Sequence, residues 1–251
     1  MTKEMTERET EKILEVCLLA GRIMMEGGAE TYRVEDTMTR IAASYGIKET
    51  HSFVTPTGII VSLQGDNPTR LVRINSRTTD LEKVAQVNQI SRKIAAGELS
   101  VQEAHQSLIQ LEESHLLFPI SYQILAAALV SGSFLIMFKG VWTDFLPAMI
   151  AGGLGYSGLL LIQHYTRVKF FAEFFASLII GLVALAMVTI GFGMELDKII
   201  IGSVMPLVPG LLITNAVRDL MVGHFVSGLS KGAEALFTAF AIGAGVAVVF
   251  L

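Results

Sequence analysis

The spacing of apolar residues divides the chain into an amphipathic part and a long, almost uncharged part. In the first part, apolar residues recur every three or four positions or gather with β-branched residues, as in helices and strands that bury one face. We therefore expect a small α+β domain over residues 1–115. The pattern predicts its helices over residues 7–26, 29–45, 79–96 and 100–115, and its strands over residues 52–64 and 69–76.

Turn and cap signals support these elements. Gly65–Pro68 lies between the two predicted strands and is a turn signal, which predicts a hairpin. Ser100 followed by Glu103 matches a capping box at the start of a helix.

The second part of the chain has the composition of membrane-spanning helices. Five stretches of 17 to 25 residues contain no Asp, Glu, Lys or Arg. A helix needs about 20 mostly apolar residues to cross a bilayer. We expect a membrane domain over residues 116–251 with five transmembrane helices, at about 117–138, 142–163, 171–193, 198–221 and 233–251.

Composition agrees with two domains in different surroundings. The 251 residues are 52% hydrophobic, and the mean hydropathy of +0.57 is high for a soluble protein. Residues 1–118 hold 13 basic and 17 acidic side chains, whereas residues 119–251 hold six of each. Net acidity without a basic cluster argues against nucleic acid as a partner. The single cysteine, Cys17, excludes an internal disulfide and a multi-cysteine metal site, and we expect it to pack in the core; we expect no metal and no cofactor.

Charge also predicts an orientation in the cell inner (plasma) membrane. The amino-terminal segment has no apolar signal-peptide core, so we expect the first domain in the cytoplasm. The inner loops then carry four basic residues and the outer loops two, which is the bias expected for cytoplasmic loops. The carboxyl terminus is expected outside. The inner residues are Arg167, Lys169, Arg218 and Lys231, and the outer ones are Lys139 and Lys198.

Small residues are frequent in two predicted membrane helices. Small side chains let helix backbones approach closely. They predict either packing among the chain's own helices or an interface in a hetero- or homo-oligomer. Examples are Gly152, Gly153, Gly155 and Gly158 in the second helix and Gly243 and Gly245 in the fifth.

The fourth predicted membrane helix is interrupted. Pro206, Pro209 and Gly210 remove backbone donors and weaken the helix within an apolar run. In a bilayer, broken backbone is tolerated only where it is buried in protein or lines a wet cavity. The resumed helix begins with free N–H groups, which transporters commonly aim at anionic substrate groups. The alternative is a proline kink that only shapes packing.

Polar residues follow the interruption at helical spacing. Asn215 and Asp219 share one face, with Arg218 beside them. A polar, glycine-bearing link over residues 223–232 then leads to the last predicted helix.

Ionisable residues near the apolar stretches are further candidates, because ionisable groups in a membrane indicate function. Glu173 and Glu234 are the acidic residues nearest to apolar stretches, and Lys231, Glu234 and Thr238 share one helical face. The alternative for these residues is ordinary charge at the membrane interface.

The chain resembles the threonine/serine exporter family in two long motifs of its second half, Pro206-x-x-Pro209-Gly210-x4-Asn215-Ala216-x-Arg218-Asp219-Leu220 and Gly228-x-x-Lys231-x-x-Glu234-Ala235. A third motif, Gly28-Ala29-x-x-x-Arg33-Val34-Glu35, is similar to the family's other signature. Within it, Glu30 and Arg33 have the spacing of an ion pair on a solvated helix face.

The resemblance covers nearly the whole chain and implies a cytoplasmic domain followed by five membrane helices. Fused members carry a second five-helix half, and this chain ends after one. The resemblance therefore implies the large subunit of the split form, whose other helices come from a separate small membrane protein. Split members are associated with export of dicarboxylates such as succinate and fused members with threonine and serine, so the substrate stays open.

We therefore hypothesise a non-enzymatic subunit of a secondary exporter for small carboxylate metabolites. Expected substrate-binding residues are Pro209, Gly210, Asn215 and Arg218, and expected proton-coupling or gating residues are Asp219, Lys231, Glu234 and Glu173. Its expected partners are the lipid bilayer, the small membrane subunit and the carboxylate substrate.

Other classes of function fit the sequence less well. No G-x4-G-K-[ST] motif is present, so the chain does not itself supply ATP hydrolysis. A membrane-embedded hydrolase is opposed by the lack of G-x-S-x-G, H-E-x-x-H and paired intramembrane aspartates. A membrane-anchored ligand-sensing or scaffold protein is the remaining alternative.

Overall fold

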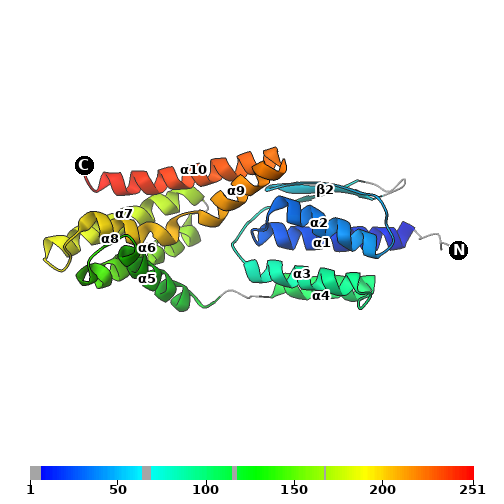
Figure 1. Ribbon diagram of the computed structural model, residues 1–251, viewed down its shortest axis with the longest axis horizontal. Coiled ribbons are helices and arrows are strands. Elements are labelled where there is room, and N and C mark those ends of the chain that lie inside the picture. The colour runs from blue at the N-terminus through cyan, green and yellow to red at the C-terminus, as the bar shows by residue number, and fades with distance from the viewer. Residues whose placement is uncertain (1–6, 64–68, 115–117, 167) are drawn as a thin grey trace. The chain divides into compact units, whose positions relative to one another are not determined.

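The computed structural model describes residues 7–63, 69–114, 118–166 and 168–251 (Figure 1). The chain forms two compact units. The first contains Met1–Leu117 together with Leu211–Gly232, and the second contains Phe118–Gly210 together with Ala233–Leu251. A segment expected in the membrane domain, residues 211–232, therefore packs with the amino-terminal part of the chain.

Among the described residues, the amino-terminal part of the first unit combines four helices with a small antiparallel sheet in the order β1-β2-β3. The helices predicted from periodicity are confirmed, and Ser100 and Glu103 form the expected capping box. The elements are α1 (Glu7–Glu26), α2 (Thr31–Ser44), β1 (Thr50–Thr55), β2 (Gly58–Leu63), β3 (Arg70–Arg73), α3 (Leu81–Ala95) and α4 (Val101–Glu113).

The strand predicted over residues 52–64 is in fact two strands. Pro56 and Thr57 form a two-residue turn, and the Thr55 hydroxyl bonds both the N–H and the carbonyl of Gly58 across it. Pro56 and Gly58 are a turn signal. The sequence prediction of one strand relied on the β-branched residues around them and gave this signal too little weight. Strands β2 and β3 pair as expected, and the predicted turn Gly65–Pro68 lies outside the described residues.

Helix α1 is the core of this unit. It contacts α2, α3, α4 and β2, and its apolar residues Val16, Cys17, Ala20 and Met24 are fully buried. On β2, Ile59 and Val61 are buried while Ile60 is exposed, the alternation of a sheet with one covered face.

The second unit contains long apolar helices. Within the described part of the chain, four helices are long and apolar enough to cross a membrane, and a fifth is counted if the broken pair Leu196–Leu207 and Gly210–Val222 is one span. This agrees with a membrane protein. The elements of this unit include α5 (Ile120–Met137), α6 (Phe145–Tyr165), α7 (Lys169–Thr189) and α8 (Leu196–Val204), and the part of α10 (Phe225–Val248) after Gly232. Helix α9 (Gly210–Val222) belongs to the first unit except for Gly210.

The break predicted at the prolines is present. Helix α8 ends at Val204, a 3₁₀ turn covers Met205–Leu207, and α9 begins at Gly210. Pro206 and Pro209 have no N–H group for a continuous helix.

The predicted start of the last helix was wrong. Helix α10 begins at Phe225 and not near residue 233, because the link after α9 is only Gly223, with φ 98°, and His224. Gly228, which suggested a link, is a packing residue within the helix: a Cβ there would lie 2.6 Å from Leu220 Cγ of α9.

Several of the small membrane residues pack within this chain. A Cβ on Gly155 would lie 2.2 Å from Ile180 of α7, and one on Gly245 of α10 would lie 2.2 Å from the Phe174 carbonyl oxygen. Gly243, by contrast, has no atom within 4 Å of that position among the described residues. The first of the two predicted roles, packing among the chain's own helices, is therefore confirmed at these contacts.

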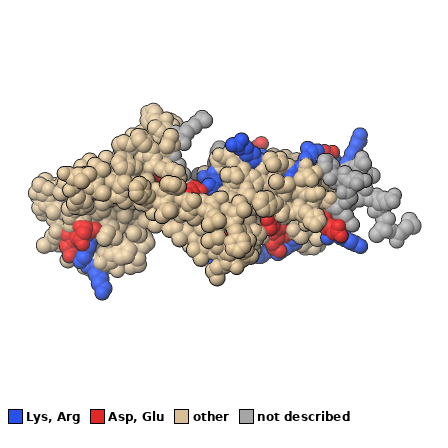
Figure 2. Space-filling view, turned by 90° about the horizontal axis from the view of Figure 1, so that it is seen from above, with Lys and Arg blue, Asp and Glu red and all other residues tan. Residues whose placement is uncertain are grey.

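Charged side chains in the second unit gather at one end of it in the face that Figure 2 shows. Lys198 Nζ binds Glu195 Oε1 at 2.8 Å and the Lys139 carbonyl at 2.9 Å. The fully buried Asp144 accepts the N–H groups of Met194 and Glu195, both at 2.8 Å. The loops after α5 and after α7, both predicted on the outer side, are thus joined at one end of the unit.

Candidate functional site

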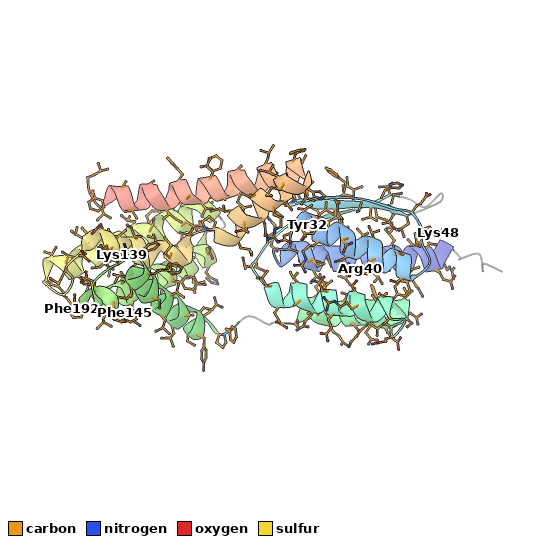
Figure 3. All side chains as sticks on the ribbon, in the orientation of Figure 1. Tyr32, Arg40, Lys48, Lys139, Phe145 and Phe192 are labelled. Carbon is orange, nitrogen blue, oxygen red and sulfur yellow. The ribbon has the colours of Figure 1, made fainter. Side chains whose placement is uncertain are left out.

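The site is built around the amino-terminal end of α2, which follows α1 after a tight turn. Gly28 has φ 89°, and the N–H of Ala29 bonds back to the Met24 carbonyl at 2.9 Å, which closes α1. Helix α2 then starts at Thr31, beside the Tyr32 labelled in Figure 3. Its N-cap residue is Glu30, whose side chain makes no capping bond. The first N–H groups of α2 therefore need an acceptor from elsewhere.

Asp219 of α9 supplies that acceptor. Its Oδ1 accepts the Thr31 N–H at 3.1 Å, and its Oδ2 accepts the Thr31 hydroxyl at 2.8 Å. A carboxylate is favourable at this place because the helix amino terminus carries a partial positive charge. Asp219 thus caps α2 from a position 188 residues away in the sequence.

Lys231 of α10 neutralises this carboxylate. Its ammonium lies 2.8 Å from Asp219 Oδ2, 3.2 Å from Thr31 Oγ1 and 3.3 Å from the Ala29 carbonyl. All three of its N–H donors therefore have partners. Asp219 is fully buried and Lys231 is 3% exposed. The result is a fully hydrogen-bonded ion pair inside the first unit.

Two further polar residues of α9, Asn215 and Arg218, bind the same turn. Asn215 Nδ2 donates to the Gly28 carbonyl at 2.9 Å. Arg218 Nη1 forms an ion pair with Glu30 Oε1, and the Arg218 side chain remains 50% exposed. The expected pairing of Glu30 with Arg33 is therefore wrong, because Glu30 points to α9. The second oxygen, Glu30 Oε2, is buried without a hydrogen-bond partner among the described residues.

The edge of β1 continues the cluster. Glu35 Oε1 accepts the Val54 N–H at 3.1 Å, and the buried Ser227 hydroxyl donates to the Val54 carbonyl at 3.0 Å. His224 Nε2 lies 3.9 Å from Glu35 Oε2. Burial raises the pKa of Glu35, and nearby Asp219 raises it further, against the lowering effects of the Val54 N–H and His224.

Close packing of α9 and α10 permits these contacts. Gly228 lies where a side chain would collide with Leu220 and with the Ala216 carbonyl of α9. Its missing Cβ lets the two helices approach, which brings Lys231 to Asp219.

The structure separates the predicted site residues into two sets. Asn215, Arg218, Asp219 and Lys231 meet in the first unit around α2. The remaining four, Pro209, Gly210, Glu173 and Glu234, belong to the second unit.

Within the second unit, Gly210 begins α9 and Glu173 of α7 is 5% exposed, whereas Glu234 is partly exposed on α10.

Sequence reasoning missed Thr31, His224 and Ser227, and it gave Glu30 the wrong partner. The signal for Glu30 and Thr31 was their place inside the Gly28–Glu35 motif. Ser227 had no signal, because it lies on α10 and its partner on β1 is 173 residues away in the sequence.

Comparison with known proteins identifies the family. The family model of the threonine/serine exporters, ThrE, matches residues 15–251. The chain belongs to the threonine/serine exporter family. Members of this family similar to it include the "Probable threonine/serine exporter" of Mycobacterium tuberculosis, 26% identical over 95% of this chain and 46% of the relative. The "Threonine/serine exporter" of Corynebacterium glutamicum is 22% identical over 93% of this chain and 50% of the relative.

This member of the exporter family thus spans about half the length of those two relatives. The "Probable succinate transporter subunit YjjP" of Escherichia coli (strain K12) is 23% identical over 96% of this chain and 95% of the relative. No solved structure matches the chain. Within the described part of this exporter-family chain, no group of three His, Cys, Asp or Glu side chains is placed to hold a metal ion.

Proposed function

We propose that this chain is a subunit of a secondary exporter of small carboxylate metabolites in the inner membrane. The observation that carries the proposal is a half-exposed Arg218 beside the buried Asp219–Lys231 pair, on the helix that follows the proline break. Family membership supports transport, and the guanidinium is the side chain best suited to a carboxylate. Threonine, serine and dicarboxylates such as succinate all carry that group.

In this mechanism, Arg218 holds the substrate carboxylate. Pro209 and Gly210 set the start of α9, where the helix carries a partial positive charge. Asn215 fixes α9 to the Gly28 carbonyl and so positions Arg218. The Asp219–Lys231 pair is the gate: it holds the α9–α10 hairpin on α2 and opens only when both charges find other partners. Glu173 and Glu234 are the remaining proton-coupling candidates.

A separate small membrane subunit completes the transporter. The similarity to proteins named succinate transporter subunits, over 88% and 95% of their length, supports this partner. The proposed orientation has the amino-terminal domain in the cytoplasm and the carboxyl terminus outside. Arg218 and Lys231 do not count toward the loop charges, because they lie on α9 and α10.

Counterflow in proteoliposomes tests the proposal. The full chain is reconstituted with and without the small subunit, and uptake of labelled threonine and succinate is compared. Arg218→Gln should lower the rate about tenfold or more, because a charge-assisted hydrogen bond is lost. Asn215→Ala should also lower it, through the position of α9.

The matched control is Arg40→Gln, which removes an exposed arginine on α2 that pairs with Asp36. It should transport normally. Absence of carboxylate uptake by the complete system, or full activity of Arg218→Gln, would overturn the proposal.

A ligand-sensing role is the second candidate, favoured by a cleft in the first unit. The cleft has a volume of about 420 Å³ and lies between α1, β3 and α4. Leu18 and Leu19 line it together with Arg22, Arg70 and His105. A sensor predicts ligand binding without transport, so the same liposome experiment separates the two functions.

A further inference from the structure

Only one of the two carboxylate oxygens of Glu30 has a hydrogen-bond partner in the described part of the chain. One oxygen pairs with Arg218, while Oε2 is buried and has no hydrogen-bond partner among the described residues. Arginine and carboxylate groups pair best through two parallel hydrogen bonds. A buried acceptor without a donor costs free energy. The Glu30–Arg218 pair is therefore weaker than the best pair these two groups can form.

Arg218 has N–H donors that are not used in its bond to Glu30. Glu30 Oε1 is its hydrogen-bond partner among the described residues, and only Nη1 takes part in that bond. A guanidinium has five N–H donors. With half of its side chain exposed, Arg218 can be reached by a second carboxylate while Glu30 is still bound.

We propose that Glu30 is a tethered stand-in for the substrate carboxylate and that substrate binding exchanges one carboxylate for the other on Arg218. The inference rests on the proposed function and adds Glu30 as a residue that sets the affinity for carboxylates. During the exchange, the Arg218 guanidinium always has one carboxylate partner, either Glu30 or the substrate. It also releases the unpartnered oxygen of Glu30 into water.

Glu30 is adjacent in the chain to Thr31, which binds the Asp219–Lys231 pair proposed as the gate. Glu30 is the N-cap of α2, and its carbonyl accepts the N–H groups of Arg33 and Val34 at 3.1 and 3.2 Å. The next residue, Thr31, is the one that binds Asp219 and Lys231. Movement of the Glu30 side chain therefore acts on the first turn of α2, where the Asp219–Lys231 pair is held.

The test is Glu30→Gln in the full chain, reconstituted with the small subunit, with KM and kcat measured for succinate and threonine. The amide keeps the size of the side chain but binds Arg218 without charge, so the KM for carboxylate substrates should fall several-fold. Asp36→Asn removes an exposed carboxylate from the same helix and should leave KM unchanged. Glu30→Asp, which keeps the charge but is one methylene shorter, should lower KM in the same direction.

An unchanged or raised KM in folded Glu30→Gln and Glu30→Asp proteins overturns the inference. If both variants fail to fold, hydrogen exchange of the wild-type chain decides instead: saturating succinate should speed exchange of the Arg33 and Val34 amides, and unchanged or slower exchange overturns the inference. Absence of carboxylate transport by the wild type is a different outcome, because it removes the proposed function itself.

Discussion

Replacing Lys231 by Met leaves the Asp219 carboxylate buried without its counterion. Asp219 is fully buried and Lys231 is 3% exposed, so water cannot substitute for the lost ammonium. Removing one partner of a buried ion pair costs about 3–5 kcal/mol. Met has a similar volume and leaves no large cavity, so the loss comes from charge and hydrogen bonding.

A double-mutant cycle separates the pair from its surroundings. Asp219→Asn keeps an acceptor for the Thr31 N–H but removes the charge. The double variant Asp219→Asn/Lys231→Met should therefore be more stable than Lys231→Met alone, since no unpaired charge remains. We expect a coupling energy of about 2 kcal/mol, within the range for residues in direct contact.

The surface pair Asp36–Arg40 of α2 is the control, because it lies in the same unit as Cys17. Its side chains are 61% and 50% exposed, and Arg40→Met should cost about 1 kcal/mol or less. The comparison shows whether burial, and not the loss of any cationic side chain, sets the magnitude.

Cys17 supplies the assay. It is the chain's single cysteine, it is fully buried in α1, and burial raises its pKa to about 12. A thiol reagent therefore labels it only when the first unit opens. Labelling rates in detergent over a urea series give the free energy of that opening. A loss below about 1 kcal/mol in Lys231→Met, or a double variant no more stable than the single one, would refute the electrostatic reasoning.

Two further variants test the packing and the titration of the site. Gly228→Ala should destabilise the α9–α10 contact by about 1–3 kcal/mol, because the new Cβ meets Leu220 at 2.6 Å. Gly243→Ala on the same helix meets no described atom and should be neutral or stabilising. Equal Cys17 labelling in both variants would contradict this. For Glu35, the pKa is raised in the folded state, so the folded protein keeps a proton that the unfolded chain loses, and the unfolding free energy should fall as pH rises from 4.5 through the raised value. Thermal melts of Glu35→Gln should show a flatter pH dependence in that window, and an unchanged profile would exclude Glu35 as the cause.

Several features of the chain were predictable from local sequence because their causes are local. The amphipathic period of α1, the capping box at Ser100 and the two prolines before α9 each act within one or two helical turns. The apolar stretches predict membrane helices by length alone. The sequence motifs also selected Asn215, Arg218, Asp219 and Lys231, which the structure brings together around one helix end.

The partners of those residues were decided by the tertiary structure. A charged residue after a broken helix has the same sequence signature whether it faces a substrate, a lipid headgroup or another helix. Thr31 and Asp219 are separated by 188 residues, and no local pattern records that the uncapped start of α2 needs the carboxylate of α9. The sequence by itself determined an amphipathic part, a long apolar part and a broken apolar helix, because hydropathy and proline chemistry depend on near neighbours. Only the tertiary structure assigned Asp219 and Lys231 to α2 and left Arg218 half exposed beside Glu30, because pairing between distant segments depends on how their helices pack.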